Sequence, residues 1–242
     1  MKILAIDTSS KICSVAIMED GKKIIELHSN DEKTHSVKLM PMVVEAFRTT
    51  SLSLDDIDLL SGCVGPGSFT GVRIGIATIK AFADAKNIPV VGVSSLESLA
   101  YNLIDMNLDN SLICSIIDAK NNNAYCGMFE KVDEKINSIS NLMADEIINI
   151  IDKINNILKS NSKYNQIVFV GDGSEIYKEI LESNIKCENI AFANEEKNIA
   201  NSISVAIAGF NKYLNGMYGN SNSIIPLYLR KSQAERALEE KN

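Results

Sequence analysis

Residues 64–83, "VGPGSFTGVRIGIATIKAFA", join a glycine-rich turn to an apolar stretch with helical periodicity. A glycine-rich loop that opens a helix is often a phosphate-binding site. Neither common phosphate motif fits here, because no Lys follows the glycines and the spacing G-x-G-x-x-x-G is one residue longer than the dinucleotide fingerprint. The stretch therefore predicts a tight turn and a helix capped by Ser68 or Thr70. Gly71 and Gly75, one helical turn apart, let that helix lie close to a neighbouring element.

The composition indicates a globular protein with a sizeable core. The 242 residues are 45% hydrophobic and 23% charged, which suits one large domain or two ordinary ones. No apolar run is long enough to span a membrane and no secretory signal is visible, so we expect a cytoplasmic protein. The five cysteines lack the paired spacing of a zinc site or a disulfide framework. A net charge of −7 without a basic run disfavours nucleic-acid binding by the chain alone.

Strands and helices are expected in the same order in both halves. In the first half we expect strands at 2–7, 12–18, 22–28, 57–64 and 88–93, and helices at 34–50, from Ser68 and from Ser94 or Ser95. In the second half we expect strands at 112–118, 124–129, 136–139, 166–173 and 188–193, and helices at 145–159, from Ser174 and at 198–214. Pro41 indicates a kink in its helix or a later start. Each half reads βββαβαβα, which predicts two α/β domains, 1–106 and 107–242, with a cleft between them and a C-terminal tail that packs back on the first.

Four segments carry a resemblance to a known family. They are "ILAIDTSSKICSVAI" (3–17), "GPGSFTGVRIG" (65–75), "IPVVGVSSLESLA" (88–100) and "PLYLR" (226–230). Together they resemble the TsaB family, bacterial proteins that take part in making threonylcarbamoyladenosine on transfer RNA. The resemblance is strong over the first hundred residues and implies two actin-like (ribonuclease H-like) domains of the sugar-kinase and actin superfamily.

The paralogous catalytic subunit, TsaD, carries a metal-binding His-x-Glu-Gly-His motif at matching positions. This chain has Ser95, Glu97 and Leu99 there, and a Leu cannot ligate a metal. His28 and His35 lie far upstream and seven residues apart. The sequence therefore predicts no metal site and no catalytic residue of its own.

Nucleotide binding in this superfamily depends on two hairpin loops. The first loop keeps Asp7, Thr8 and Ser9, which are candidates for contact with a phosphate or Mg²⁺ and equally fit a hydrogen-bonded turn. The second loop, 118–123, has no glycine that would let the backbone approach a phosphate. Glycines remain in "VGDGS" (170–174), where such folds hold adenosine. We expect this chain to bind no cofactor by itself, while its partner subunits use ATP and a metal.

The helix around residues 37–47 is apolar on more than one face, since only Lys38 and Glu45 are charged. It is either a fully buried core helix or a helix with an exposed stripe that docks to another chain. The candidates for a partner interface on this helix and on the glycine-rich helix are Met40, Val43, Val44, Phe47, Val72, Ile76 and Ile79.

The resemblance implies a non-catalytic subunit of the complex that forms threonylcarbamoyladenosine. The implied partners are the catalytic subunit TsaD and the small ATPase subunit TsaE, with a homodimer when the chain is alone. Transfer RNA would be met only through the complex, and no membrane is involved. The alternatives are a small-molecule kinase or ATPase of the actin-like superfamily and a metallopeptidase-like protein.

Overall fold

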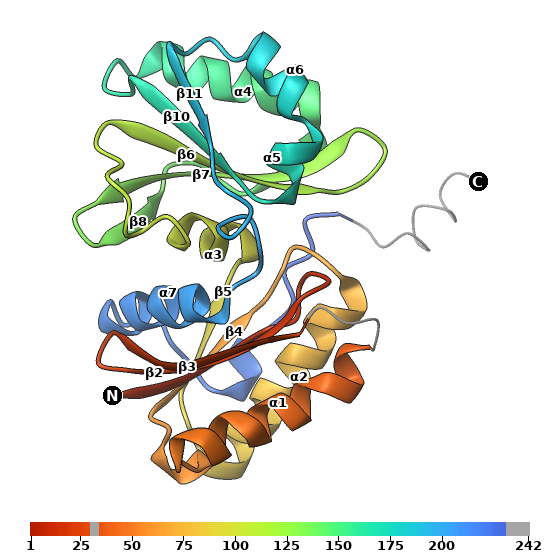
Figure 1. The fold of residues 1–242 in the computed structure, drawn as a ribbon, viewed down its shortest axis with the longest axis vertical. Helices are drawn as coiled ribbons and strands as arrows, with labels where there is room; N and C mark the ends of the chain where they lie inside the picture. Colours follow the sequence, from red (N-terminus) through yellow and green to blue (C-terminus); the bar gives the residue numbers. More distant parts are fainter. Residues whose placement is uncertain (30–33, 231–242) are drawn as a thin grey trace.

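The computed structural model describes residues 1–29 and 34–230. Two mixed sheets lie one above the other, each with its own helices (Figure 1). The first region contains β1 (Lys2–Asp7), β2 (Cys13–Glu19), β3 (Lys22–Ser29), α1 (His35–Thr50), η1 (Leu54–Asp56), β4 (Leu59–Cys63), α2 (Phe69–Lys86), β5 (Val90–Val93) and α3 (Ser95–Tyr101). The second contains β6 (Ser111–Asp118), β7 (Asn123–Val132), β8 (Lys135–Ser138), β9 (Met143–Glu146), α4 (Ile147–Ser160), β10 (Gln166–Val170), α5 (Asp172–Ile176), α6 (Lys178–Asn184) and β11 (Asn189–Phe192). The chain ends with α7 (Ser202–Leu214), η2 (Ser221–Ser223) and an extended segment.

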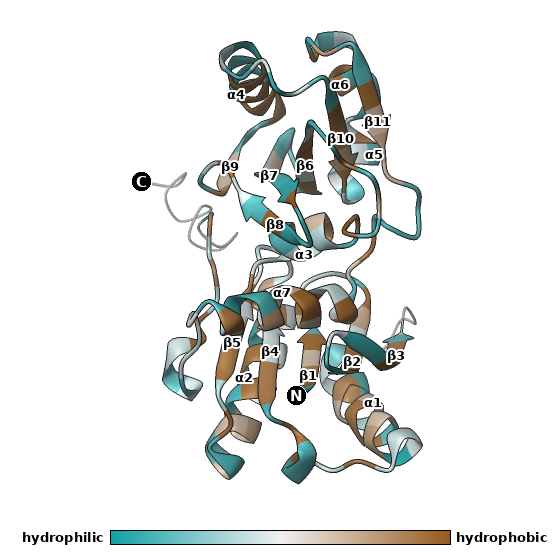
Figure 2. Ribbon diagram, turned by 90° about the vertical axis from the view of Figure 1, so that its left-hand side faces the viewer, coloured by the Kyte–Doolittle hydropathy of each residue, from teal (hydrophilic) through white to brown (hydrophobic). Residues whose placement is uncertain are grey.

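The two sheets share one topology. Their strand orders are β3-β2-β1-β4-β5 and β8-β7-β6-β10-β11, with β9 paired to β7. In both, the first three strands are antiparallel and the last two continue the sheet in parallel. The strands β1 and β4 are buried along almost their whole length because helices cover both faces of the sheet. Figure 2 shows the resulting apolar runs along β1, β4 and β5. This duplicated α/β arrangement is the predicted two-domain actin-like fold.

The helix α7 belongs in space to the first sheet, although it follows the second sheet in sequence. It lies against β1, β2, β4 and β5, on the face opposite α1 and α2 (Figure 1). The helices α3 and α7 fill the space between the two sheets, and one apolar cluster runs through both domains. That cluster joins Ile3, Leu96, Ile113, Phe129 and Val205. The two structural units are thus not simply the two halves of the sequence.

Three local features differ from the sequence-based expectations. The strand β9 was not predicted. Where one helix was expected from Ser174, the structure has α5 and α6, which meet at Tyr177. The helix α1 begins at His35, before Pro41, so the later start was wrong. None of the helices in the described part of the chain is long and apolar enough to cross a membrane.

Candidate functional site

The glycine-rich turn positions α2 against the first hairpin loop. The Ser68 side chain accepts a hydrogen bond from the Gly71 N–H and so caps α2, as the sequence predicts. A Cβ atom at Gly71 would overlap the Thr8 carbonyl oxygen, and one at Gly75 would overlap the Thr8 hydroxyl. The Thr8 hydroxyl donates to the Gly71 carbonyl oxygen at 2.7 Å. The glycines therefore allow the helix to contact the chain's own loop directly, in the place where a ligand would need room.

The first-loop candidates Asp7, Thr8 and Ser9 are buried and bonded within the chain. They are at most 5% exposed. The Ser9 N–H and the Ser9 hydroxyl both donate to Asp7 Oδ1, at 2.8 and 2.7 Å. Burial raises the pKa of the Asp7 carboxyl above its usual value, while the hydrogen bonds from Ser9 oppose that shift. Asp7 thus already accepts the hydrogen bonds that Ser9 would have to donate to a phosphate in this position.

In the second hairpin, between β6 and β7, backbone donors are likewise bonded to carboxylates, one from the hairpin and one from α5. The Lys120 N–H donates to Asp118 Oδ1 at 3.0 Å, and the Asp118 N–H donates to Asp172 Oδ1 at 3.1 Å. Although burial raises the pKa of Asp118, the hydrogen bonds from Lys120 and Tyr177 prevail and lower it, so this carboxylate is ionised at neutral pH. The Lys120 ammonium also pairs with Asp118 Oδ2 at 2.6 Å, so both charged groups of the loop are engaged with each other. These residues do not fit a phosphate clasp.

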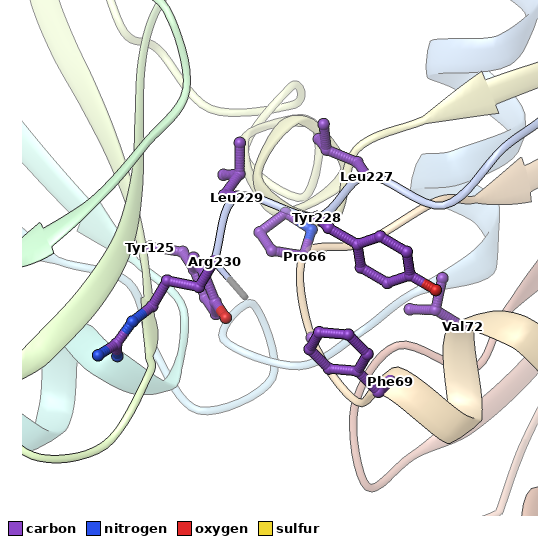
Figure 3. Close-up of a pocket in the computed structure, with 9 residues that line it drawn as sticks. Pro66, Phe69, Val72, Tyr125, Leu227, Tyr228, Leu229 and Arg230 are labelled. Atoms are coloured by element: carbon purple, nitrogen blue, oxygen red, sulfur yellow. The ribbon is translucent and has the colours of Figure 1, made fainter. Parts of the chain in front are cut away.

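An extended C-terminal segment crosses between the two hairpins (Figure 3). The Leu227 N–H donates to the Val64 carbonyl oxygen beside the glycine turn, and Arg230 donates to the Ala119 carbonyl oxygen in the second hairpin. Figure 3 shows Arg230 pointing toward the second domain, while Tyr228 lies on Phe69 of α2. The cavity left between these residues has a volume of about 10 Å³. Small-molecule sites are usually at least about thirtyfold larger, so the segment leaves no room for a nucleotide here.

Ser95, Glu97 and Leu99, which the sequence analysis aligned with a metal-binding motif, each make another contact. The Ser95 hydroxyl donates to the Pro66 carbonyl oxygen. Glu97 forms an ion pair with Lys212, with Oε2 and Nζ 2.6 Å apart. Leu99 lies in the apolar core. Within residues 1–29 and 34–230, no group of three or more His, Cys, Asp or Glu side chains is arranged to hold a metal ion.

The helix α1 has two different apolar faces. Leu39, Val43 and Ala46 are at most 2% exposed and pack on the sheet. On the outer face, Val37 is 57% and Val44 is 60% exposed, with Met40 between them at 45%. The spacing of these three residues, 3 and 4, places them on one side of the helix. Phe47, also a predicted interface residue, is half-buried against the core.

The structure corrects the orientation that the sequence analysis gave to four interface candidates. Val43, Val72, Ile76 and Ile79 are 0–4% exposed and belong to the core of the first domain. On α2, the exposed residues are small, polar or charged: Thr70, Arg73, Ala77, Ala81, Asp84, Ala85 and Lys86. Val37 was missed, although its spacing from Met40 and Val44 was available in the sequence. We define the outer stripe of α1 as Val37, Met40 and Val44.

A small aromatic cluster lies at the start of α2. The rings of Phe69 and Tyr228 stack, with centroids 4.7 Å apart and planes inclined by 7°. Arg73 donates from Nε to the Tyr228 hydroxyl at 2.7 Å, and its guanidinium lies within 6 Å of both rings. This cluster fixes the C-terminal segment to α2, and α1 lies beside α2 (Figure 1). Nothing in the sequence pattern pairs Phe69 with a residue 159 positions later.

Comparisons with known proteins agree with this architecture. The chain matches the family model TsaD, described as tRNA N6-adenosine threonylcarbamoyltransferase, over residues 28–238. It is 30% identical over 235 residues to the tRNA threonylcarbamoyladenosine biosynthesis protein TsaB of Bacillus subtilis, covering 97% of this chain and 96% of that protein. The solved structure of YeaZ from Pseudomonas aeruginosa has a TM-score of 0.78 at 22% identity, covering 94% of this chain and 99% of that one. A ROK hexokinase from Thermus thermophilus has a TM-score of 0.54 at 10% identity, covering 88% and 100%, so the fold is shared with sugar kinases. The chain therefore belongs to the TsaB family, within the wider group that the TsaD family model describes.

Proposed function

We propose that this chain is a non-catalytic subunit of the complex that forms N6-threonylcarbamoyladenosine beside the anticodon of transfer RNAs reading codons that start with A. The catalytic subunit, TsaD, is its partner. In this role the chain stabilises the partner and helps to shape the site at their interface. The small ATPase subunit TsaE joins the pair, and transfer RNA is met only through the assembled complex in the cytoplasm.

The outer stripe of α1 is the observation that carries the proposal. A helix that covers one sheet face needs a single apolar face, and Leu39, Val43 and Ala46 already supply it. The exposed Val37, Met40 and Val44 add a second apolar face that residues 1–29 and 34–230 leave exposed. Contiguous exposed apolar side chains mark interfaces with other proteins. The small outward side chains Ala77 and Ala81 on the adjacent α2 allow a helix of the partner to approach closely.

Two further observations support a non-catalytic role. In each hairpin loop a backbone donor, the N–H of Ser9 or of Lys120, is bonded to a carboxylate of the chain, and the C-terminal segment lies between the hairpins. The three positions that match a metal-binding motif hold Ser95, Glu97 and Leu99, each with a structural contact. We propose that ATP and the metal belong to the partner subunits. A kinase or a peptidase would require donors and ligands that these residues do not offer.

Co-expression with the catalytic subunit tests the proposal. The wild-type chain should co-elute with TsaD in size-exclusion chromatography at ordinary salt and form a homodimer when alone. Met40→Glu and Val44→Glu should abolish both associations and fail to restore threonylcarbamoyladenosine in cells that lack the wild-type chain. Ile148→Glu is the matched control, because Ile148 is 48% exposed on α4, away from the outer stripe. If Ile148→Glu weakens assembly as much as Val44→Glu, or if neither stripe variant weakens it, the docking role is wrong.

A further inference from the structure

A second cavity lies between the two domains, on the other face of α3 from the hairpin loops. Its volume is about 310 Å³, within the size range of small-molecule sites. On one face of α3, Ser95 bonds to Pro66 in the glycine turn, and Leu99 lies near Gly171 of the second domain. Glu97 and Tyr101, by contrast, line this cavity. Both domains supply walls, because β8 and the end of β7 face α3 and α7 across the domain boundary (Figure 1).

The charge of the cavity differs from that of the whole chain. The protein carries −7, but the ionisable side chains that line this cavity, besides Tyr101, are Lys135, Lys212 and Glu97. Glu97 forms an ion pair with Lys212 at 2.6 Å, and Lys212 also donates to the Gly92 carbonyl oxygen at 3.1 Å. The exposed Lys135 ammonium makes no ion pair or side-chain hydrogen bond with any residue that the structure describes. The formal charges that line the cavity thus sum to +1, with Lys135 at its rim, which favours an anion.

A buried hydroxyl adds a donor with no acceptor. Tyr101 is 3% exposed, and its hydroxyl oxygen accepts hydrogen bonds from Asn211 Nδ2 at 3.2 Å and from the Ile136 N–H at 3.4 Å. Both bonds use the oxygen as an acceptor, so the hydroxyl proton is available to an acceptor in the cavity. Burial raises the pKa of Tyr101, which keeps this proton in place at neutral pH.

The remaining walls suit a partly apolar molecule. Phe129 and Ile136 line the cavity from the second domain, Leu142 extends this wall, and Met217 stands at the rim, 56% exposed. Asn137 and Asn215 contribute amide groups that can orient a polar edge. A site with a few placed polar groups on an apolar surface is typical of pockets for small organic ligands.

We propose that this cavity binds a small organic anion, whose carboxylate or phosphate oxygen accepts a hydrogen bond from the Tyr101 hydroxyl and lies near Lys135. The apolar body of the ligand rests on Phe129, Leu142 and Met217. Because the ligand contacts both domains, its binding stabilises their observed arrangement. The site is separate from the outer stripe of α1, so this proposal stands or falls independently of the docking role.

The test uses the fluorescent anion 8-anilinonaphthalene-1-sulfonate, which has a charged group and an aromatic body. It should bind the full-length chain at one saturable site. Lys135→Glu should weaken binding at least ~tenfold, the size expected for reversing a nearby charge. Tyr101→Phe should also weaken it. The control Lys159→Glu reverses a charge in the same domain, on α4 and away from the cavity, and should leave binding unchanged.

Competition then identifies the ligand's anionic group. Phenyl phosphate or phenylacetate should displace the probe. If phenyl phosphate binds more tightly, the natural ligand carries a phosphate, and if phenylacetate does, it carries a carboxylate. The uncharged 2-phenylethanol should not compete. Circular dichroism checks that each variant is folded, and Lys135→Glu decides alone if Tyr101→Phe melts early. The proposal is overturned if Lys135→Glu binds the probe like wild type. Displacement of the probe by 2-phenylethanol but by neither anion would also overturn it. So would loss of probe binding in Met40→Glu, because the probe would then be bound at the outer stripe.

Discussion

Val43 and Val44 are adjacent in α1, but Val43 faces the core and Val44 faces solvent. Val43 is 2% exposed and packs in the core of the first domain, whereas Val44 is 60% exposed on the outer stripe. The two side chains are identical and are neighbours along the same helix, so they differ mainly in burial. The same substitution at the two sites therefore separates the stability of the fold from the association of the chain.

We expect Val43→Glu to unfold the domain or to lower its free energy of unfolding by at least ~3 kcal/mol, because a carboxylate without a partner would be buried. Val44→Glu should change that free energy by less than ~0.5 kcal/mol, since the side chain is exposed to solvent. Urea unfolding followed by circular dichroism measures both values. Size-exclusion chromatography should show Val44→Glu as a monomer. Equal destabilisation of the two variants would show that α1 is buried on both faces.

The second prediction concerns the contact between α2 and the first hairpin loop. Helix propensity alone predicts that Gly71→Ala stabilises the protein by ~1 kcal/mol. In the structure, however, the new Cβ would overlap the Thr8 carbonyl oxygen, so we expect a loss of ~1–3 kcal/mol from overpacking. Ala77→Gly, on the exposed face of the same helix, should lose only about 1 kcal/mol through propensity. Thermal and urea unfolding of both variants measure these changes, and a more stable Gly71→Ala would contradict the close contact.

These two regions show how far the sequence could determine the site. The periodicity of β1, β2 and α4 predicted their positions because each has one clear apolar pattern. In α1, only Lys38 and Glu45 interrupt an apolar run, so periodicity could not decide whether Val43 or Val44 faces the sheet. The choice depends on how α1 sits on β2 and β3, which is a tertiary contact. The same holds for α2, where the apolar residues Val72 and Ile76 fill the core and the outward face is small and polar.

Other features depend on contacts between distant segments. The placement of α7 against β1, the stacking of Tyr228 on Phe69 and the cavity beside Tyr101 each join residues that are far apart in sequence. The strand β9 is short and half-buried, so its four residues carry no alternating pattern to recognise. The sequence motifs predicted the family and the topology. They did not predict which surfaces the folded chain leaves exposed.

The third prediction is that the purified chain neither hydrolyses ATP nor is stabilised by it. Three backbone donors of the hairpin loops, the N–H groups of Ser9, Asp118 and Lys120, are bonded to carboxylates of the chain. A ligand present at 100 times its dissociation constant would raise the free energy of unfolding by ~2.7 kcal/mol. With millimolar Mg²⁺ and ATP, we expect the melting temperature to match that of a control with equal ionic strength. Steady phosphate release that Asp7→Ala abolishes would contradict this prediction and favour the kinase alternative.

The last prediction is a pH dependence that originates at Asp7. Burial raises the pKa of this carboxyl in the folded protein above the value of about 3.9 that it has in an unfolded chain. Protonated Asp7 therefore contributes stability that is fully present below the pKa of the unfolded chain. This contribution is lost as the pH rises through the higher pKa of Asp7 in the folded protein. Asp7→Asn retains an oxygen that can accept the hydrogen bonds from Ser9 and has no charge to bury. Relative to wild type, this variant should therefore become more stable as the pH rises from below 3.9, until the difference levels off above the folded pKa.

Asp20→Asn provides a comparison with the opposite sign. The hydrogen bond from the N-terminal ammonium lowers the pKa of Asp20, so its contribution is present above the unfolded pKa and is lost as the pH falls. Relative to wild type, Asp20→Asn should thus lose stability as the pH rises. Urea unfolding from pH 3.5 to pH 7 measures both differences below the titration of the N-terminal ammonium, whose pKa Asp20 raises, and residues that titrate equally in variant and wild type cancel. If the Asp7→Asn difference is flat or falls with rising pH, Asp7 is not a buried carboxylate that resists ionisation, and its loop is open enough to solvate a charge.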